Sequence, residues 1–172
     1  MEEYWTPEEK RRLKEAGKIS ELADIALVVL DRMSVSSDNR EITQICGPMT
    51  TGGLGNLRDN MALFEYAITV AGENGFYVFN QLPFQDGMVR ILNWAPGQKV
   101  YRQEILEEFY RPIFASGKVQ KTLFLPDWQS SHGASWEFGL LGELGIPRND
   151  FPIELLTSAR IVNHSSELGM KR

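Results

Sequence analysis

The chain has 172 residues, of which 42% are hydrophobic and 24% charged, and its formal net charge is −5. This length suits one compact domain with a sizeable core. The acidic balance excludes a basic surface field that would gather nucleic acid or anionic lipid. A small phosphorylated ligand stays compatible with this charge, because backbone N–H groups bind phosphate without net positive charge.

Cys46 is the only cysteine, which excludes an internal disulfide and a cysteine-based zinc site and is typical of a reducing compartment. Residues 1–18 mix acidic and basic side chains and contain no apolar signal segment. No run approaches the ~18 apolar residues of a membrane span. We therefore expect a cytoplasmic protein with no membrane partner and no nucleic-acid partner.

The first predicted element is a long N-terminal helix. Thr6 suits its N-cap, Pro7 its first turn, and Glu9 the position that completes a capping box. Apolar residues then recur at helical spacing up to Met33, which predicts an amphipathic helix over residues 7–33.

Residues 34–40 form a polar break after this helix. We therefore predict two parts, a helical appendage over residues 1–40 and an α/β domain over residues 41–172. The helix carries more apolar surface than a helix surrounded by water would tolerate. The helix is thus expected to pack on the domain or on a partner subunit.

The domain is predicted to alternate strands with helices. Strands are expected at residues 41–46, 76–79 and 121–125, with a further strand at 88–92 in an irregular aromatic stretch, and helices at 57–74, 101–114, 134–144 and 151–160. The alternation implies a single-domain Rossmann or flavodoxin-like α/β fold, in which helices flank a mainly parallel sheet. Ligands of such sheets bind beyond the carboxyl ends of the strands, where the loops 47–55 and 126–133 follow.

The loop GPMTTGGLG, residues 47–55, joins a strand to a helix. Its glycines permit close approach of the backbone to a ligand, and Thr50 and Thr51 offer hydroxyls. The helix that follows offers free N–H groups to an anion. The loop lacks the Lys-Ser/Thr of a Walker loop and the GxGxxG of a dinucleotide turn. The alternative is a plain turn with flexible glycines.

The segment DWQSSHGASWEFG, residues 127–139, combines a polar loop with a helix start. It places Glu137 about one turn into the predicted helix. There the positive end of the helix dipole would hold a carboxylate ionised, by roughly 0.3–1 kcal/mol. An anionic Glu137 suits a nucleophile, or a base that grips a hydroxyl, better than a proton donor. The alternative is that Glu137 only complements the dipole.

Other chemistries find little support in the sequence. His132 and His164 are the only histidines, and their spacing predicts no metal site. No GxSxG elbow is present, which argues against a serine triad. Trp128, in a loop beside Asp127, is the best candidate for stacking on a base, and the alternative is a core tryptophan.

Three segments carry a resemblance to a known family. They are ICGPMTTGG (45–53), FYVFNQ (76–81) and LPDWQSSHGASWEFGLLGELGIP (125–147), and the last is the most specific. In this order they resemble the nucleoside 2-deoxyribosyltransferase superfamily, and within it the phage- and bacteria-associated branch known as DUF4406. The resemblance spans about residues 41–147.

The superfamily cleaves or exchanges the N-glycosidic bond of nucleosides or nucleotides through a glutamate nucleophile, which the resemblance places at Glu137. Six residues earlier, Ser131 stands where the branch that acts on monophosphates has a phosphate-binding serine. The resemblance therefore implies a nucleoside 5′-monophosphate as the ligand. The substrate- and phosphate-binding residues expected with it are Gly47, Thr50, Thr51, Gly52, Gly53, Ser131, Gly133 and Ser135.

Two positions depart from the superfamily's pattern. Gln44 replaces a tyrosine that hydrogen-bonds the nucleophile. The helix before the third strand lacks the aspartate thought to act as general acid, so Glu107 or Glu108 would have to take its place. Glu108 is therefore expected as the second catalytic residue beside Glu137.

The expected function is cleavage or transfer of the N-glycosidic bond of a nucleoside 5′-monophosphate, without a cofactor. One alternative is a catalytically silent nucleotide-binding module, such as a sensor or a sponge. Another is a different phosphoribohydrolase or an unrelated carboxylate enzyme. Superfamily members form dimers or larger assemblies in which a neighbour helps to close the site. A homodimer is therefore expected here, with the helix of residues 57–74 or the N-terminal helix at its interface.

Overall fold

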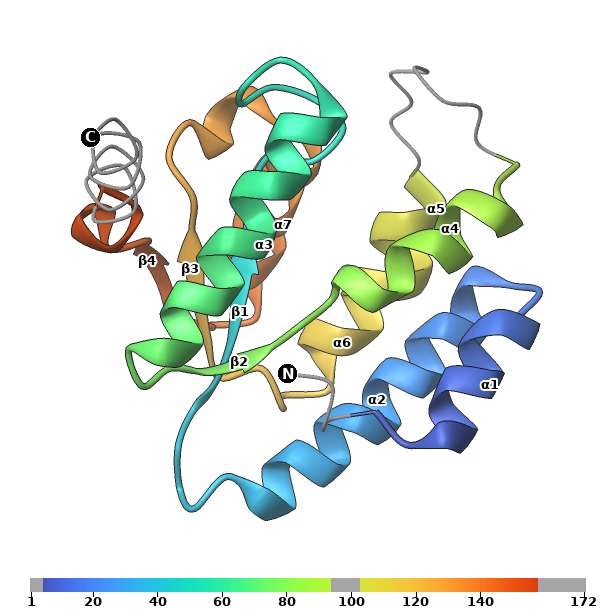
Figure 1. Ribbon diagram of the computed structural model, residues 1–172. Helices are drawn as coiled ribbons and strands as arrows, with labels where there is room; N and C mark the ends of the chain where they lie inside the picture. Colours follow the sequence, from blue (N-terminus) through green and yellow to red (C-terminus); the bar gives the residue numbers. More distant parts are fainter. Residues whose placement is uncertain (1–4, 94–102, 158–172) are drawn as a thin grey trace, which may run out of the picture.

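The computed structural model describes residues 5–93 and 103–157, and its centre is a parallel four-stranded sheet (Figure 1). Thr43 aligns with Val78 on one neighbouring strand and with Lys121 on the other. The single-domain α/β fold with additional N-terminal helix, expected from the alternation of strands and helices, is confirmed. The strands are β1 (Ile42–Cys46), β2 (Tyr77–Phe79), β3 (Lys121–Phe124) and β4 (Arg148–Asp150).

The strand order across the sheet is β2-β1-β3-β4. The helix α3 (Leu57–Glu73) carries the chain from β1 to β2, and the chain then crosses back past β1 to build β3 and β4 on the other side. This order creates a topological switch point between β1 and β3. Ligands of flavodoxin-like sheets bind at such a point, outside the carboxyl ends of the strands.

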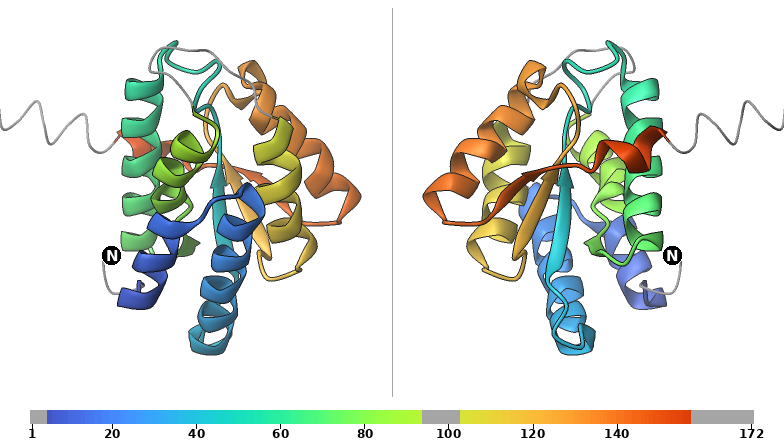
Figure 2. Two further views of the ribbon diagram at one scale, coloured as in Figure 1. Left: turned by 90° about the vertical axis from the view of Figure 1, so that its right-hand side faces the viewer. Right: turned by 90° about the vertical axis from the view of Figure 1, so that its left-hand side faces the viewer.

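Helices cover both faces of the sheet, with α3 on one side and α6 and α7 on the other (Figure 2). On the first face, α3 shares a hydrophobic core with Ile45. Because neighbouring residues of a strand point to opposite faces, Ile42, Gln44 and Cys46 share the second face. The helices that contribute to the core on this second face include α2 (Ile19–Ser36), α4 (Gln85–Ile91), α6 (Arg111–Ala115) and α7 (His132–Glu143).

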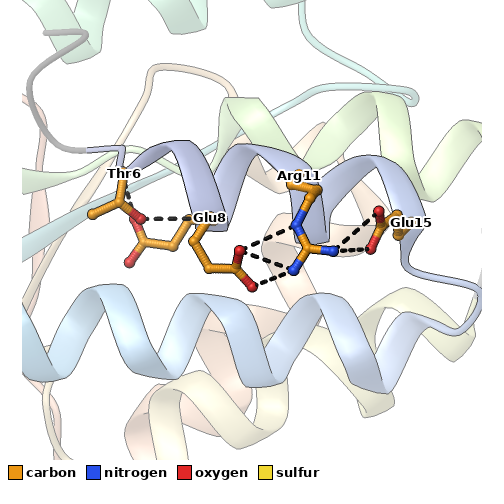
Figure 3. A network of polar contacts seen from close by, with 5 residues as sticks. Thr6, Glu8, Arg11 and Glu15 are labelled. Carbon is orange, nitrogen blue, oxygen red and sulfur yellow. Dashed lines mark hydrogen bonds and ion pairs between the residues drawn. The ribbon is translucent and has the colours of Figure 1, made fainter.

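The N-terminal region forms two helices, so the single helix expected over residues 7–33 is wrong. The first, α1 (Pro7–Glu15), starts with the predicted capping box. Thr6 N donates to the Glu9 carboxylate over 2.9 Å, and Glu9 N donates to Thr6 Oγ1 over 3.2 Å (Figure 3). Gly17 follows directly after the C-cap residue of α1, a place where glycine commonly ends a helix.

Ion pairs run along α1 and join it to α2. Arg11 pairs with Glu8 at 2.7 Å and with Glu15 at 3.2 Å on the solvent side (Figure 3). Such exposed pairs contribute little to stability, because solvent screens the two charges. Glu9 is buried and pairs with Arg32 of α2, so this contact fixes how α1 lies on α2.

The helix α2 shares the core of the sheet. Most of its apolar residues from Ile19 to Met33 are buried in one cluster with Phe79 and Phe124 of the strands. The apolar stripe that predicted a helix thus packs on its own chain. In the part of the chain that the structure describes, no helix is both long and apolar enough to cross a membrane.

Two further segments differ from the expectation. Residues 88–92 are largely helical, in α4, because Met88 packs in the core with α2. The strand β4 was not expected, since its residues are polar and exposed. It forms at the edge of the sheet beside β3, where Phe151 N donates to Phe124 O over 2.8 Å. Residues 153–157 are helical, and the rest of the helix expected up to residue 160 lies outside the described residues.

The helix expected over residues 101–114 is described from Gln103 onward and runs through Pro112. Pro112 has no N–H to donate to the carbonyl of Glu108, four residues earlier, and a wider π-helical turn lies at this place. This turn carries Tyr110. The parts of the helix are α5 (Gln103–Ile105), the π-helical turn η3 (Leu106–Tyr110) and α6.

Candidate functional site

A pocket lies at the carboxyl ends of β1 and β3, where the loop after β1 meets the start of α7. Its cavity volume is about 80 Å³. A buried water needs roughly 10–15 Å³ by this measure, so the cavity holds a group the size of a sugar ring. The residues expected from the sequence that line it are Gly47, Thr50, Thr51, Ser131, Gly133 and Glu137.

Hydrogen bonds tie the loop after β1 to the loop after β3. Gly53 N donates to Ser130 Oγ over 2.8 Å, and His132 N donates to Thr51 Oγ1 over 3.2 Å. Asn60, buried on α3, holds the first loop from its other side by donating to two of its carbonyls. These hydrogen bonds hold the loop after β1 in place beside the pocket without a ligand.

Protein contacts require glycine at positions 47 and 52 of this loop. A Cβ on Gly47 would lie 2.8 Å from Leu125 Cβ, and a Cβ on Gly52 would lie 2.3 Å from Ser130 Oγ. Gly52 also has a φ of +70°, where side chains are strained. Gly47 lines the pocket, whereas Gly52 and Gly53 do not. The last two therefore shape the loop, and the structure does not bring them to the expected phosphate.

The start of α7 offers a donor to the pocket. Ser131 is its buried N-cap, and Ser131 Oγ accepts a first-turn N–H over 3.3 Å. The N–H of His132 donates to Thr51 Oγ1. The N–H of Gly133, the next along the helix, has no protein partner among the described residues. Free N–H groups at a helix start bind anions. An anion at this end would thus reach the Gly133 N–H and the hydroxyls of Ser131 and Thr50.

Glu137 lies in the second turn of α7, and only 6% of its surface is exposed. Desolvation raises its pKa from 4.5 to about 8, although a hydrogen bond with Cys46 lowers it. Glu137 is therefore protonated in the free protein at neutral pH. The ionised carboxylate expected from the helix dipole is wrong, because that field falls off within the first turn and desolvation outweighs it.

Two buried groups share the surroundings of Glu137. Burial, reinforced by the charge of Glu137, raises the pKa of the Cys46 thiol well above its usual value, so the thiol stays a donor to the carboxyl. Tyr110 lines the pocket from η3, and burial, again with the charge of Glu137, raises the pKa of its phenol. The carboxyl thus has the Cys46 thiol as a neutral donor, and it shares the pocket lining with the Tyr110 phenol.

Besides Gly52 and Gly53, three further residues assigned from the sequence lie outside the pocket lining. Glu108 is exposed on η3, so it is not placed to give a proton there. Ser135 is exposed on α7. Trp128 stacks on Phe138 with the ring centroids 4.3 Å apart and the planes at 18°, so its ring is engaged in packing rather than open to a base.

The structure adds Tyr110, Cys46 and Gln81 to the site. Gln81 Nε2 donates to the Ile45 carbonyl over 2.7 Å, while Gln81 Oε1 has no partner among the described residues. The signal for Cys46 and Gln81 was their position at or just after the carboxyl end of a strand. Gln44, in the place of the superfamily's tyrosine, is fully buried, and no described residue bonds its amide, so it does not hydrogen-bond Glu137.

No protein-family model, curated protein or solved structure matches this chain. Within residues 5–93 and 103–157, no three His, Cys, Asp or Glu side chains are grouped as metal ligands. His164, one of the two histidines, lies outside these ranges.

Proposed function

We propose that this protein binds a nucleoside 5′-monophosphate in the pocket and cleaves or transfers its N-glycosidic bond, with Glu137 as the nucleophile. The observation that carries the proposal is that a buried carboxyl and a helix start with an unpaired N–H line one small pocket. The resemblance of residues 41–147 to the nucleoside 2-deoxyribosyltransferase superfamily supports the same ligand.

The spacing along α7 suits such a ligand. Gly133 and Glu137 are four residues apart, which corresponds to about 6 Å along the helix axis. A phosphate on the Gly133 N–H and the Ser131 hydroxyl is separated from the anomeric carbon by the C5′ group and part of the sugar ring, so that carbon comes within reach of Glu137. Apolar lining residues such as Leu106 keep water from the reacting atoms.

The reaction would follow the course of a retaining glycosidase. An oxygen of the ionised Glu137 carboxylate bonds to the anomeric carbon, while the bond from that carbon to the base nitrogen breaks and its electron pair leaves with the base. Water, or a second base in a transferase, then displaces Glu137. Because the free protein holds Glu137 protonated, only the ionised fraction attacks.

Release of free base from a panel of substrates tests this function. The protein is incubated with ribonucleosides, deoxyribonucleosides and their 5′-monophosphates, and free base is measured by chromatography. Monophosphates are expected to release base faster than the matching nucleosides. A panel in which no compound releases base, and none gives a heat of binding in calorimetry, would contradict the proposal.

A catalytically silent nucleotide-binding module is the second candidate, and one observation favours it. Glu137 is the only carboxylate among the described residues that line the pocket, so no second carboxyl is present to protonate a leaving base. Calorimetry separates the two candidates, since binding of a monophosphate without release of its base is the result expected of a silent module.

Ser131→Ala is expected to weaken binding of a 5′-monophosphate about tenfold or more. The reason is that a hydrogen bond to a charged group is worth about 1.5–3 kcal/mol. Binding of the free nucleoside is expected to stay nearly unchanged, and calorimetry measures both affinities.

Because Ser131 also caps α7, the variant should lose roughly 1 kcal/mol of stability as well. Thr6→Ala is the matched control, since it removes the N-cap of α1 away from the pocket. It should lower stability without changing either affinity. Equal losses for nucleoside and monophosphate in Ser131→Ala would make Ser131 a structural residue only.

A homodimer is a further expectation from the superfamily. The apolar side of α2 is buried against its own chain, so an interface on the N-terminal helices would use other surfaces. Light scattering is expected to give twice the chain mass of 19.5 kDa. A clean monomer at high micromolar concentration would rule out the dimer and any site completed by a partner.

A further inference from the structure

Tyr110 is the one polar residue that the described helix from Gln103 to Ala115 contributes to the pocket lining. Its ring is held by Phe114, stacked at 6.2 Å, and lies edge-on to Phe109 at 5.0 Å. Only 7% of the residue is exposed, yet within residues 5–93 and 103–157 no hydrogen bond reaches its hydroxyl. The hydroxyl is not among the fully buried polar atoms that lack a partner, so it is open to the pocket, where a bound molecule can accept its hydrogen bond.

The two glutamates of the same helix do not serve the pocket. Glu107 pairs with Arg111, and Glu108 is exposed; neither lines the cavity. A leaving base departs with an electron pair on its nitrogen and therefore needs a proton. Tyr110 is a donor that lines the same pocket as Glu137, the carboxyl that attacks. Because the pKa of the phenol is raised, Tyr110 keeps its proton over the whole range in which Glu137 ionises.

We propose that Tyr110 is the proton donor to the leaving base, an inference that rests on the proposed function. As the bond from the anomeric carbon to the base breaks, its electron pair stays on the base nitrogen, which takes the proton of the Tyr110 hydroxyl. Glu137 bonds to the anomeric carbon in the same step. Water then attacks that carbon, the bond to Glu137 breaks with its electrons returning to the carboxylate, and the proton of the water restores Tyr110.

Tyr110→Phe tests the proposal, because it removes the hydroxyl and keeps the ring. The kcat for cleavage of nucleoside 5′-monophosphates is expected to fall about 10²–10⁴-fold, with KM little changed. A ribosyl 5-phosphate that carries 4-nitrophenol as its leaving group is the decisive second substrate. Its nitrophenolate is a stable anion and needs no proton, so Tyr110→Phe should cleave it at the wild-type rate.

Tyr66→Phe is the matched control. Tyr66 lies on α3 outside the pocket, and its hydroxyl donates to the Leu155 carbonyl over 3.1 Å. This substitution removes a phenol oxygen outside the pocket, so the variant should have the wild-type kcat on both substrates. The melting temperature of Tyr110→Phe should stay close to that of the wild type, since no described protein group loses a hydrogen bond.

The outcomes separate the inference from the function on which it rests. Equal losses on the nucleotide and the nitrophenyl substrate, or no loss on the nucleotide, would overturn the role of Tyr110 while wild-type cleavage upholds the proposed function. If the wild type cleaves neither substrate, the proposed function fails and the role of Tyr110 fails with it.

Discussion

Glu137→Gln is expected to abolish turnover while the fold and ligand binding survive. An amide has no charge with which to attack the anomeric carbon, and loss of a nucleophile is expected to lower kcat at least about 10³-fold. Because the free protein holds Glu137 in its neutral form at pH 7, an amide of the same shape should change neither packing nor affinity for a monophosphate. Base release measures kcat, and calorimetry measures affinity.

Glu143→Gln is the matched control for this variant. It removes the same formal charge from α7 at an exposed position outside the pocket, so kcat should not change. Glu137→Asp keeps a carboxyl but withdraws it by one methylene group, and its kcat should also fall strongly because attack requires close approach. Unchanged turnover in Glu137→Gln would remove this residue from the mechanism and contradict the proposed nucleophile.

The central sheet was predictable because the strands β1, β2 and β3 each carry their own signal in the sequence. Apolar runs rich in β-branched or aromatic residues stand before a glycine or polar loop at β1, β2 and β3. The strand β4 carries no such run. It exists because β3 offers hydrogen bonds at the sheet edge, such as that of Thr122 N to Pro147 O at 3.0 Å. A strand made by tertiary pairing leaves little trace in its own residues.

The candidate site was also predictable only in part. Glu137 and Ser131 stand just after a clear strand, so the sheet's topology places them at its carboxyl edge. Tyr110 was missed because its segment has the pattern of an ordinary amphipathic helix, whereas the chain forms a π-helical turn before Pro112. The charge state of Glu137 was also missed, because its burial depends on side chains far away in the sequence, such as Cys46.

Glu137→Gln is also expected to stabilise the fold at alkaline pH, and this effect needs no substrate. The pKa of Glu137 is about 8 in the folded protein against 4.5 ordinarily, so folding holds its proton more tightly. Below pH 4.5 both states are protonated and burial of the acid carries no ionisation penalty. As pH rises from 4.5 to about 8 the unfolded chain loses the proton first, so stability falls; above about 8 the loss is complete.

One pKa unit corresponds to about 1.4 kcal/mol, so over the 3.5 units from 4.5 to about 8 the wild type should lose up to roughly 5 kcal/mol through Glu137. Glutamine does not ionise and escapes that loss. For a chain of this size the variant should therefore melt roughly 10–20 °C above the wild type at pH 9 and close to it at pH 4.5. Thermal unfolding followed by circular dichroism measures the difference, and Glu143→Gln, exposed on the same helix, should show none. Parallel melting curves for Glu137→Gln and the wild type across this range would mean that Glu137 ionises freely in the folded protein and is not the desolvated carboxyl on which the proposed chemistry depends.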